Sequence, residues 1–159
     1  MSGGIHPSIG AATAAVKSAL LTRFQAALDA AGENEVDCRI GFMWPSQWFD
    51  QIAITSAATS SDAETVTMQR RQHKTVRQDV SITVFRATAE QAETMSRAYQ
   101  LLDVLDQAMR DEPTLDGAAL WCFADDLQSD GVTLPEEAGD GRVEEIVITY
   151  AARVLITRP

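Results

Sequence analysis

Few side chains in this sequence have the types and spacing that catalysis requires. His6 lies in a Gly-rich start (1–7) and His73 in a basic stretch, and we expect both to be solvated side chains and not catalytic bases. Adjacent carboxylates on an extended chain point apart, so the following pairs predict a solvated acidic face: Asp125-Asp126, Glu136-Glu137 and Glu144-Glu145. A Gly-rich phosphate loop, HExxH and GxSxG are all missing from the sequence. We therefore predict no catalytic residues, and the chain is not expected to be an enzyme.

Ligands for metals or cofactors are equally scarce. Cys38 and Cys122 lie in alternating apolar stretches, and without a CxxC or a second pair we expect them to be small buried hydrophobes. The acidic run 125–131 lacks the ligand spacing and the terminal Glu of a calcium-binding loop. We predict neither a metal site nor a cofactor.

The charge of the chain is strongly negative and unevenly distributed. The net charge is −10 and the sequence pI is about 4.5, which argues against general binding to nucleic acid through its phosphates. A basic segment nevertheless lies in mid-chain: Arg70, Arg71, His73, Lys74 and Arg77. Acidic residues crowd the C-terminal third, Glu136 and Glu137 among them. The two blocks could pair within a subunit or between subunits, and the basic segment is expected to meet an acidic patch on another copy or a partner, rather than DNA.

Two of the three tryptophans, Trp44 and Trp48, lie in a connection interrupted by Pro45. Tryptophans on a loop can be anchors of a protein interface. They can also fold back over the edge of their own core, which is the interpretation we favour. Both alternatives remain open at the level of the sequence.

Two amphipathic helices are predicted, at about 8–31 and 88–111. The first begins near Ser8 and should end at Gly32, a residue suited to the left-handed C-terminal position. In the second, Thr88 and Gln91 have the spacing of a capping box, and Pro113 follows the expected end.

Alternation of apolar and polar residues predicts strands at 36–42, 51–57, 76–84, 118–123 and 144–157. Residues 58–75 hold few large apolar side chains and predict a long polar loop, although the tip of two extended hairpin strands is nearly as well supported. The segment 128–142 is expected to be an acidic connection, and 1–7 a flexible start.

Together these elements predict an α+β fold in which two main helices flank a single mixed or antiparallel sheet. At 159 residues and 45% hydrophobic, the chain is expected to form one domain over 1–159. Its apolar runs are shorter than a membrane span, and its start lacks a signal-peptide pattern, so we expect no membrane contact and synthesis in the cytosol.

This order of elements resembles the tail terminator, or tail-completion, proteins of long-tailed bacteriophages. The resemblance covers nearly the whole chain and depends on four stretches: the helix Ser8–Ala31, the strand Asp79–Val84, the turn Asp111–Gly117 (DEPTLDG) and the sequence Gly141–Ile148. Of these, only the turn is distinctive.

The resemblance implies a virion structural protein that forms a hexameric ring on the head-proximal end of the tail tube. Such a ring ends tube polymerisation and presents the surface to which the head connector or stopper docks, while DNA passes through it without sequence-specific binding. Proteins of this kind serve both contractile and non-contractile tails, and siphovirus tails are among them. They are assembled in the host cytoplasm and contribute no catalytic residues. Another neck or head-completion connector protein is the first alternative, and an enzyme of unrecognised type is the second.

Overall fold

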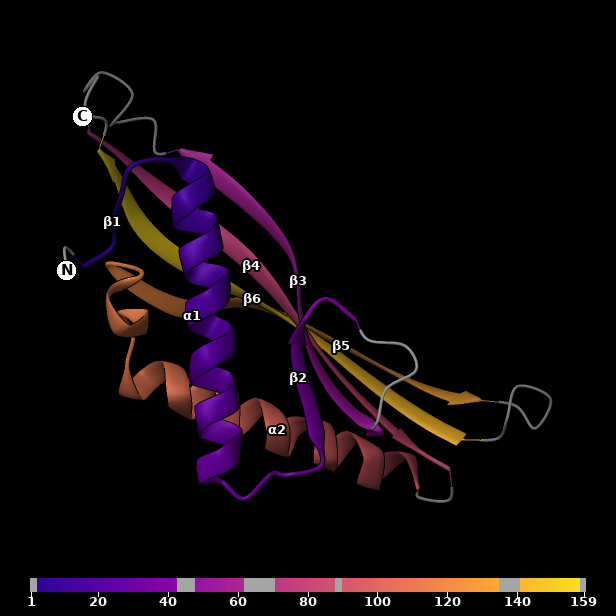
Figure 1. The fold of residues 1–159 in the computed structure, drawn as a ribbon. Coiled ribbons are helices and arrows are strands. Elements are labelled where there is room, and N and C mark those ends of the chain that lie inside the picture. The colour runs from indigo at the N-terminus through magenta and orange to yellow at the C-terminus, as the bar shows by residue number, and fades with distance from the viewer. Residues whose placement is uncertain (1–2, 43–47, 62–70, 88–89, 135–140, 158–159) are drawn as a thin grey trace.

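The computed structural model describes residues 3–42, 48–61, 71–87, 90–134 and 141–157 (Figure 1). These residues form an α+β fold, as predicted, with one mixed six-stranded sheet and two long helices. The elements are β1 (Ile5–His6), α1 (Ile9–Ala30), β2 (Val36–Ile40), β3 (Asp50–Ser61), β4 (Arg71–Arg86), α2 (Gln91–Asp111), the 3-10 turn η2 (Leu115–Gly117), β5 (Trp121–Leu134) and β6 (Gly141–Thr157).

The sheet is built around the last strand, β6. β4 and β6 pair antiparallel without a register shift, from Arg71 opposite Thr157 to Arg86 opposite Arg142. On its other side β6 pairs with β5 over most of its length and, beyond the start of β5, with the short parallel strand β1. β3 and then β2 extend the sheet beyond β4, which gives the order β1-β6-β4-β3-β2.

Both helices pack on the same face of this sheet (Figure 1). Even-numbered residues of β4 and β6 point to that face, and the apolar ones among them are buried, for example Val80 and Ile148. Phe24 of α1 packs on Tyr150 of β6 with ring centroids 5.5 Å apart, and Leu101 and Leu105 of α2 complete the same core. The alternation of each strand thus buries one apolar face and leaves the other face free of these helices.

The first helix ends where the sequence predicts. The Ser8 hydroxyl accepts a hydrogen bond from the Ala11 N–H at 3.1 Å, and Gly32 adopts a φ of 75° just after the helix. Such a φ is strained for residues with a Cβ atom and is natural for glycine. The predicted start near Ser8 and the predicted end at Gly32 are therefore both confirmed, and Ser8 is the N-cap residue.

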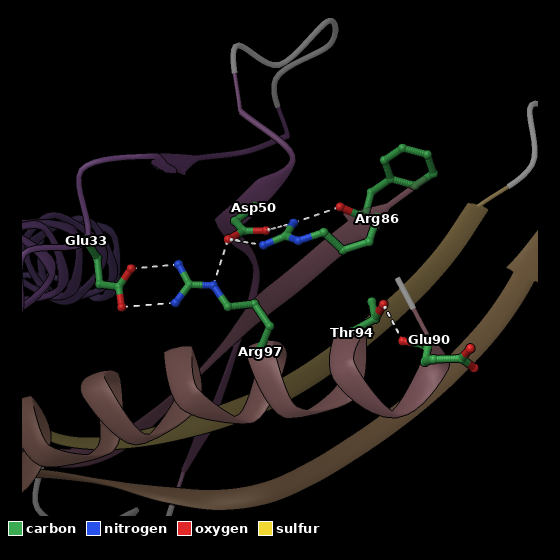
Figure 2. Close-up of polar contacts among 7 residues, drawn as sticks. Glu33, Asp50, Arg86, Glu90, Thr94 and Arg97 are labelled. Atoms are coloured by element: carbon green, nitrogen blue, oxygen red, sulfur yellow. Dashed lines mark hydrogen bonds and ion pairs between the residues drawn. The ribbon is translucent and has the colours of Figure 1, made fainter. Parts of the chain in front are cut away.

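The predicted capping box of the second helix is wrong. Thr88 lies outside the described residues, and α2 begins at Gln91 with Glu90 at the N-cap position. The Gln91 amide donates to Glu144 Oε2 at 3.1 Å and to the Val143 carbonyl at 3.2 Å, so it ties the helix to β6. Within the first turn, the Thr94 hydroxyl donates to the Glu90 carbonyl (Figure 2). The Gln91 side chain therefore bonds to β6, and not to the start of its own helix as the spacing of Thr88 and Gln91 indicated.

The polar segment 58–75 is not a loop over its described parts. β3 and β4 form an extended antiparallel hairpin in which Ser60 lies opposite Thr75 and Ser61 opposite Lys74. Residues 62–70 lie outside the described part of the chain. Backbone hydrogen bonds form the ladder here, and threonine and serine can take part in it without large apolar side chains. The segment therefore lacks the apolar alternation from which strands are predicted. The alternative of two extended hairpin strands is confirmed for the described residues.

Three further boundaries differ from the prediction. The strand expected at 118–123 begins at Trp121 and continues to Leu134, so residues 128–134 of the expected connection are strand. β5 and β6 therefore form a second long hairpin. Ile5 and His6, expected to be flexible, pair with Leu155 and Ile156 as β1.

Candidate interaction surface

The face of the sheet opposite the helices is the main surface that the described elements leave open. The side chains at odd-numbered positions of β4 and β6 point to this open face, because even-numbered ones point to the helices. Two small residues of this face are buried: Ser81 in its middle and Ala151 opposite Phe123.

An exposed aromatic pair marks one end of the open face. Trp121 and Phe123 stand two residues apart on β5, opposite Arg153 and Ala151 of β6. Their rings stack with centroids 4.9 Å apart and an interplanar angle of 23°. They are 39% and 46% exposed although they are large and apolar. Exposed, ordered aromatic side chains of this kind are typical anchors of protein interfaces.

Charged side chains of both signs share this part of the open face with the aromatic pair. Arg71 and Arg77 are odd-numbered residues of β4, and Arg153 of β6 lies directly beside Trp121. A bulge in β5 between Ala124 and Asp126 leaves one extra residue, Asp125, which forms an ion pair with Arg77. Both side chains are at least one-third exposed, so this pair contributes little stability. We call the set Arg71, Arg77, Arg153, Trp121 and Phe123 the aromatic–basic end.

The other end of the open face is acidic. Asp130 of β5 points to this face directly opposite Glu145 of β6, whereas Asp126, opposite Thr149, lies in the middle of the face. Like charges directly opposite each other on neighbouring strands repel and destabilise the ladder. The Ser81 hydroxyl donates to Glu145 Oε1 at 3.4 Å, a single long contact. We call Asp130 and Glu145 the acidic end.

An ion network fixes the sheet to the helices (Figure 2). Asp50, at the start of β3, is 4% exposed and accepts hydrogen bonds from Arg86 Nη1 at 2.5 Å and from Arg97 Nε at 2.9 Å. Arg97 of α2 also makes two hydrogen bonds to the Glu33 carboxylate, at 3.0 and 2.6 Å. The hydrogen bonds from Arg97 hold the pKa of Glu33 below its usual value, and Glu33 in turn raises the pKa of Arg97. The network joins the ends of β3 and β4 to α2 and to the connection after α1.

The structure brings only part of the predicted interaction set onto the open face. Arg71 and Arg77 lie there, whereas Lys74 belongs to the alternate set that faces the helices. Trp48 is half-buried just before β3, and its role stays a prediction. Four members lie outside the described residues: Arg70, Trp44, Glu136 and Glu137.

The remaining candidate residues are structural. Cys38 and Cys122 are free and buried as expected, and burial raises the pKa of each thiol to about 12. His6 was expected to be solvated, but its Nε2 atom lies 2.7 Å from the Ala118 carbonyl oxygen, so it docks β1 onto the turn after α2. Within the described residues, His, Cys, Asp and Glu side chains form no group of three that could hold a metal ion. Neither described helix is apolar over enough of its length to cross a membrane.

Sequence reasoning missed Trp121 and Phe123 as surface residues and missed the ion network. Trp121 and Phe123 alternate with Cys122 in an apolar run, and only the packing of both helices on the Cys122 side shows that the other side of the strand is open. Glu33, Asp50 and Arg97 are isolated charges far apart along the sequence. Their convergence depends on the packing of α2 across the sheet, which local patterns do not encode.

These features define a two-layer α+β domain with one helix-covered sheet face and one open, charge-divided face. No family model matches the sequence, and no curated protein matches it. Among solved structures, the chain is similar to one from the "Virion of native gene transfer agent (GTA) particle", with 15% sequence identity, a TM-score of 0.49, and coverage of 86% of this chain and 93% of that chain. At this identity and TM-score the similarity contributes nothing to the functional argument.

Proposed function

We propose that this protein is a structural component of a phage virion that caps the head-proximal end of the tail tube as a ring, ends tube polymerisation and joins the tail to the head. The observation that most supports an assembly role is the open sheet face, with its exposed aromatic pair and its two oppositely charged ends. The order of elements, from the long first helix through the DEPTLDG turn to the final strand, supports the tail terminator class in particular.

The DEPTLDG turn has a structural role in the fold. Leu115 and Asp116 adopt φ angles of 52° and 55°, and Leu115 is buried. This tight conformation turns two carbonyls toward the N-terminal segment: Gly117 accepts from the Gly4 N–H at 2.7 Å, and Ala118 lies next to His6. The turn thus fixes the start of the chain beside the end of β6. Non-glycine residues in this region of φ are strained and persist only where the surroundings hold them.

The proposed ring is a hexamer that contacts the tube protein on one side and the head connector or stopper on the other. The strongly acidic composition suits a channel that repels DNA phosphates and lets DNA pass without sticking. Glu136 and Glu137 are proposed to face this channel. Labels on these two residues that remain fully accessible from outside the ring would contradict that placement.

The β3–β4 hairpin is proposed to contact a neighbouring subunit or the tube. It presents Arg71 at its described end, and Arg70 and Lys74 belong to the same basic segment. Neutralising Arg70, Arg71 and Lys74 together should weaken attachment to the tube. Unchanged tail attachment in this variant would contradict the role of the hairpin.

The direct test of the function is electron microscopy of particles assembled while the gene for this protein is silenced. Tails of uncontrolled length that are not attached to filled heads are the expected result. Normal tails beside emptied heads would instead assign the protein to the head side of the neck. Particles of wild-type appearance would contradict the proposed function.

A further inference from the structure

We propose that the open edge of β5 is a docking site for an extended, basic segment of a partner protein. The segment would add a strand beside β5 and place a lysine or arginine side chain in the groove between β5 and α2. This site would be present whether or not the protein caps a tail tube.

The edge of β5 is long and unpaired. β5 is the outermost strand on its side of the sheet, and it pairs with β6 along one edge while no described strand pairs with the other (Figure 1). Every residue from Phe123 to Gly131 is exposed, on both faces of the strand. β5 has 14 residues, whereas β1 and β2, which also have an open edge, have 2 and 5. A long edge with unpaired backbone N–H and C=O groups is a template for a further strand.

Both faces beside this edge can receive side chains of an added strand. On the helix side, a groove of about 290 Å³ lies between β5 and α2, and its apolar lining includes Leu102, Leu127 and Ile148. Leu127 is 43% exposed there. On the open face, the stacked rings of Trp121 and Phe123 are exposed. Because side chains of a strand alternate between two faces, an added segment would contact the groove with one set and the aromatic pair with the other.

The charge of the groove identifies its ligand as basic. Four of the eight residues that line it are aspartates: Asp103, Asp106, Asp125 and Asp126. Arg110 pairs with Asp106, and Arg77 pairs with Asp125. Asp103 and Asp126 form no ion pair with another described residue. A lysine or arginine stem packs on apolar surface while its charged head binds a carboxylate, so such a side chain fits both parts of the groove.

A second copy of this chain does not offer this ligand. Its basic strand β4 is already paired on both edges, with β3 and β6. Among its described strands, β1, β2 and β5 have an open edge, and none of these three has a net positive charge at neutral pH. Two copies of β5 side by side would bring together the carboxylates of Asp125, Asp126 and Asp130. These carboxylates protect the edge from self-pairing and leave it open to a basic strand.

Binding of a synthetic peptide tests the site. The probe is a short peptide of alternating lysine and valine with blocked ends, titrated into the full-length protein by calorimetry. Hydrogen exchange should then show protection of the β5 amides and no change at β2, the open edge on the other side of the sheet. A peptide of equal charge in which prolines replace the central valines should bind about 10-fold or more weakly, because proline removes the backbone donors of a strand.

Two protein variants separate the groove from the general acidity of the protein. Asp103→Asn with Asp126→Asn should weaken binding of the probe about 10-fold or more, the loss expected for two hydrogen bonds to charged groups. Asp29→Asn with Glu35→Gln is the matched control, since it removes two charges from exposed residues near β2 and should leave binding unchanged. Leu127→Lys should abolish binding by placing a cation in the groove. Circular dichroism confirms that each variant is folded.

The outcomes decide the site independently of the proposed function. Equal binding of the two peptides, or an equal loss in the two double variants, would indicate only general attraction to an acidic protein and would overturn the docking site. Failure of the probe to bind, or protection of β2 in place of β5, would overturn it as well. Protection of β5 that rises with protein concentration without any peptide would assign the edge to a second copy and overturn the choice of partner. The tail terminator role is decided separately by tail length after silencing. Protection of β5, with binding lost only in the groove variants, supports the proposal.

Discussion

Replacing Arg97 by methionine should lower the free energy of unfolding by roughly 3 kcal/mol, because it removes the central cation of a buried network. Arg97 donates one hydrogen bond to Asp50, whose side chain is 5% exposed, and two to Glu33, whose side chain is 25% exposed. A hydrogen bond to a charged group contributes about 1.5–3 kcal/mol when it is buried. The bond to Asp50 should approach that range, and water reduces the two bonds to Glu33.

The loss is large compared with the stability of an ordinary domain, about 5–15 kcal/mol. Methionine retains much of the apolar packing of the arginine stem, so the change measures the guanidinium group. Asp50 keeps Arg86 as a partner, which should prevent complete unfolding. The assay is urea unfolding followed by tryptophan fluorescence, with an unchanged m-value showing that the same surface is exposed.

Arg110→Met provides a matched control on the same helix. The Arg110 side chain is 74% exposed and forms an i,i+4 ion pair with Asp106 at 2.9 Å. An exposed helical pair of this kind contributes about 0.3–0.5 kcal/mol. An Arg97→Met loss below about 1 kcal/mol, or equal to the Arg110→Met loss, would refute the reasoning that burial makes this network strong.

Three other changes should give distinct results. Glu33→Gln should destabilise the protein at neutral pH, and the loss should shrink as pH falls through the lowered pKa of Glu33. A carboxyl group with a lowered pKa stabilises the fold only while it is ionised. A difference in urea midpoint that does not depend on pH would contradict this. Gly4→Ala should loosen β1, because a Cβ atom there would lie 2.3 Å from the Leu120 nitrogen and φ is 69°. Gly3→Ala is the control, since its Cβ atom would meet nothing within 4 Å. Equal amide exchange at His6 in both variants would contradict the steric clash at Gly4. Cys38 and Cys122 should react with a thiol reagent at pH 8 only after denaturation, and rapid labelling of the native protein would show that they are not buried.

The sequence predicted which helices and strands form better than it predicted where they begin and end or which side of them is buried. The period of β6 and the caps of α1 are local properties, and they are found where the residues indicate. On α2, however, the helical pattern does not settle which side is buried: Met95 is exposed, whereas Leu101 is fully buried. The side of a helix that faces the core depends on how the helix crosses the sheet, which periodicity alone specifies only within about one residue.

The long hairpins show a second limit of sequence patterns. Ser60 and Ser61 form strand because β4 offers a complete ladder beside them, and not because they prefer an extended conformation. The open face was likewise unpredictable, since alternation identifies two faces of a strand but not which face the helices cover. The charge division could be read from the sequence, but its arrangement on one surface required the register of β4, β5 and β6.

The position of β6 also has a consequence for the order in which the protein can fold. Although β6 is the last described element in the chain, it lies between β4 on one side and β5 and β1 on the other. The sheet therefore cannot close before β6 has been made, and until then the β3–β4 hairpin has one unpaired edge. Contacts between residues far apart in sequence slow folding and leave strand edges exposed to aggregation. We expect refolding to be slow for a domain of this size and sensitive to protein concentration, and any truncation that enters β6 to abolish the fold.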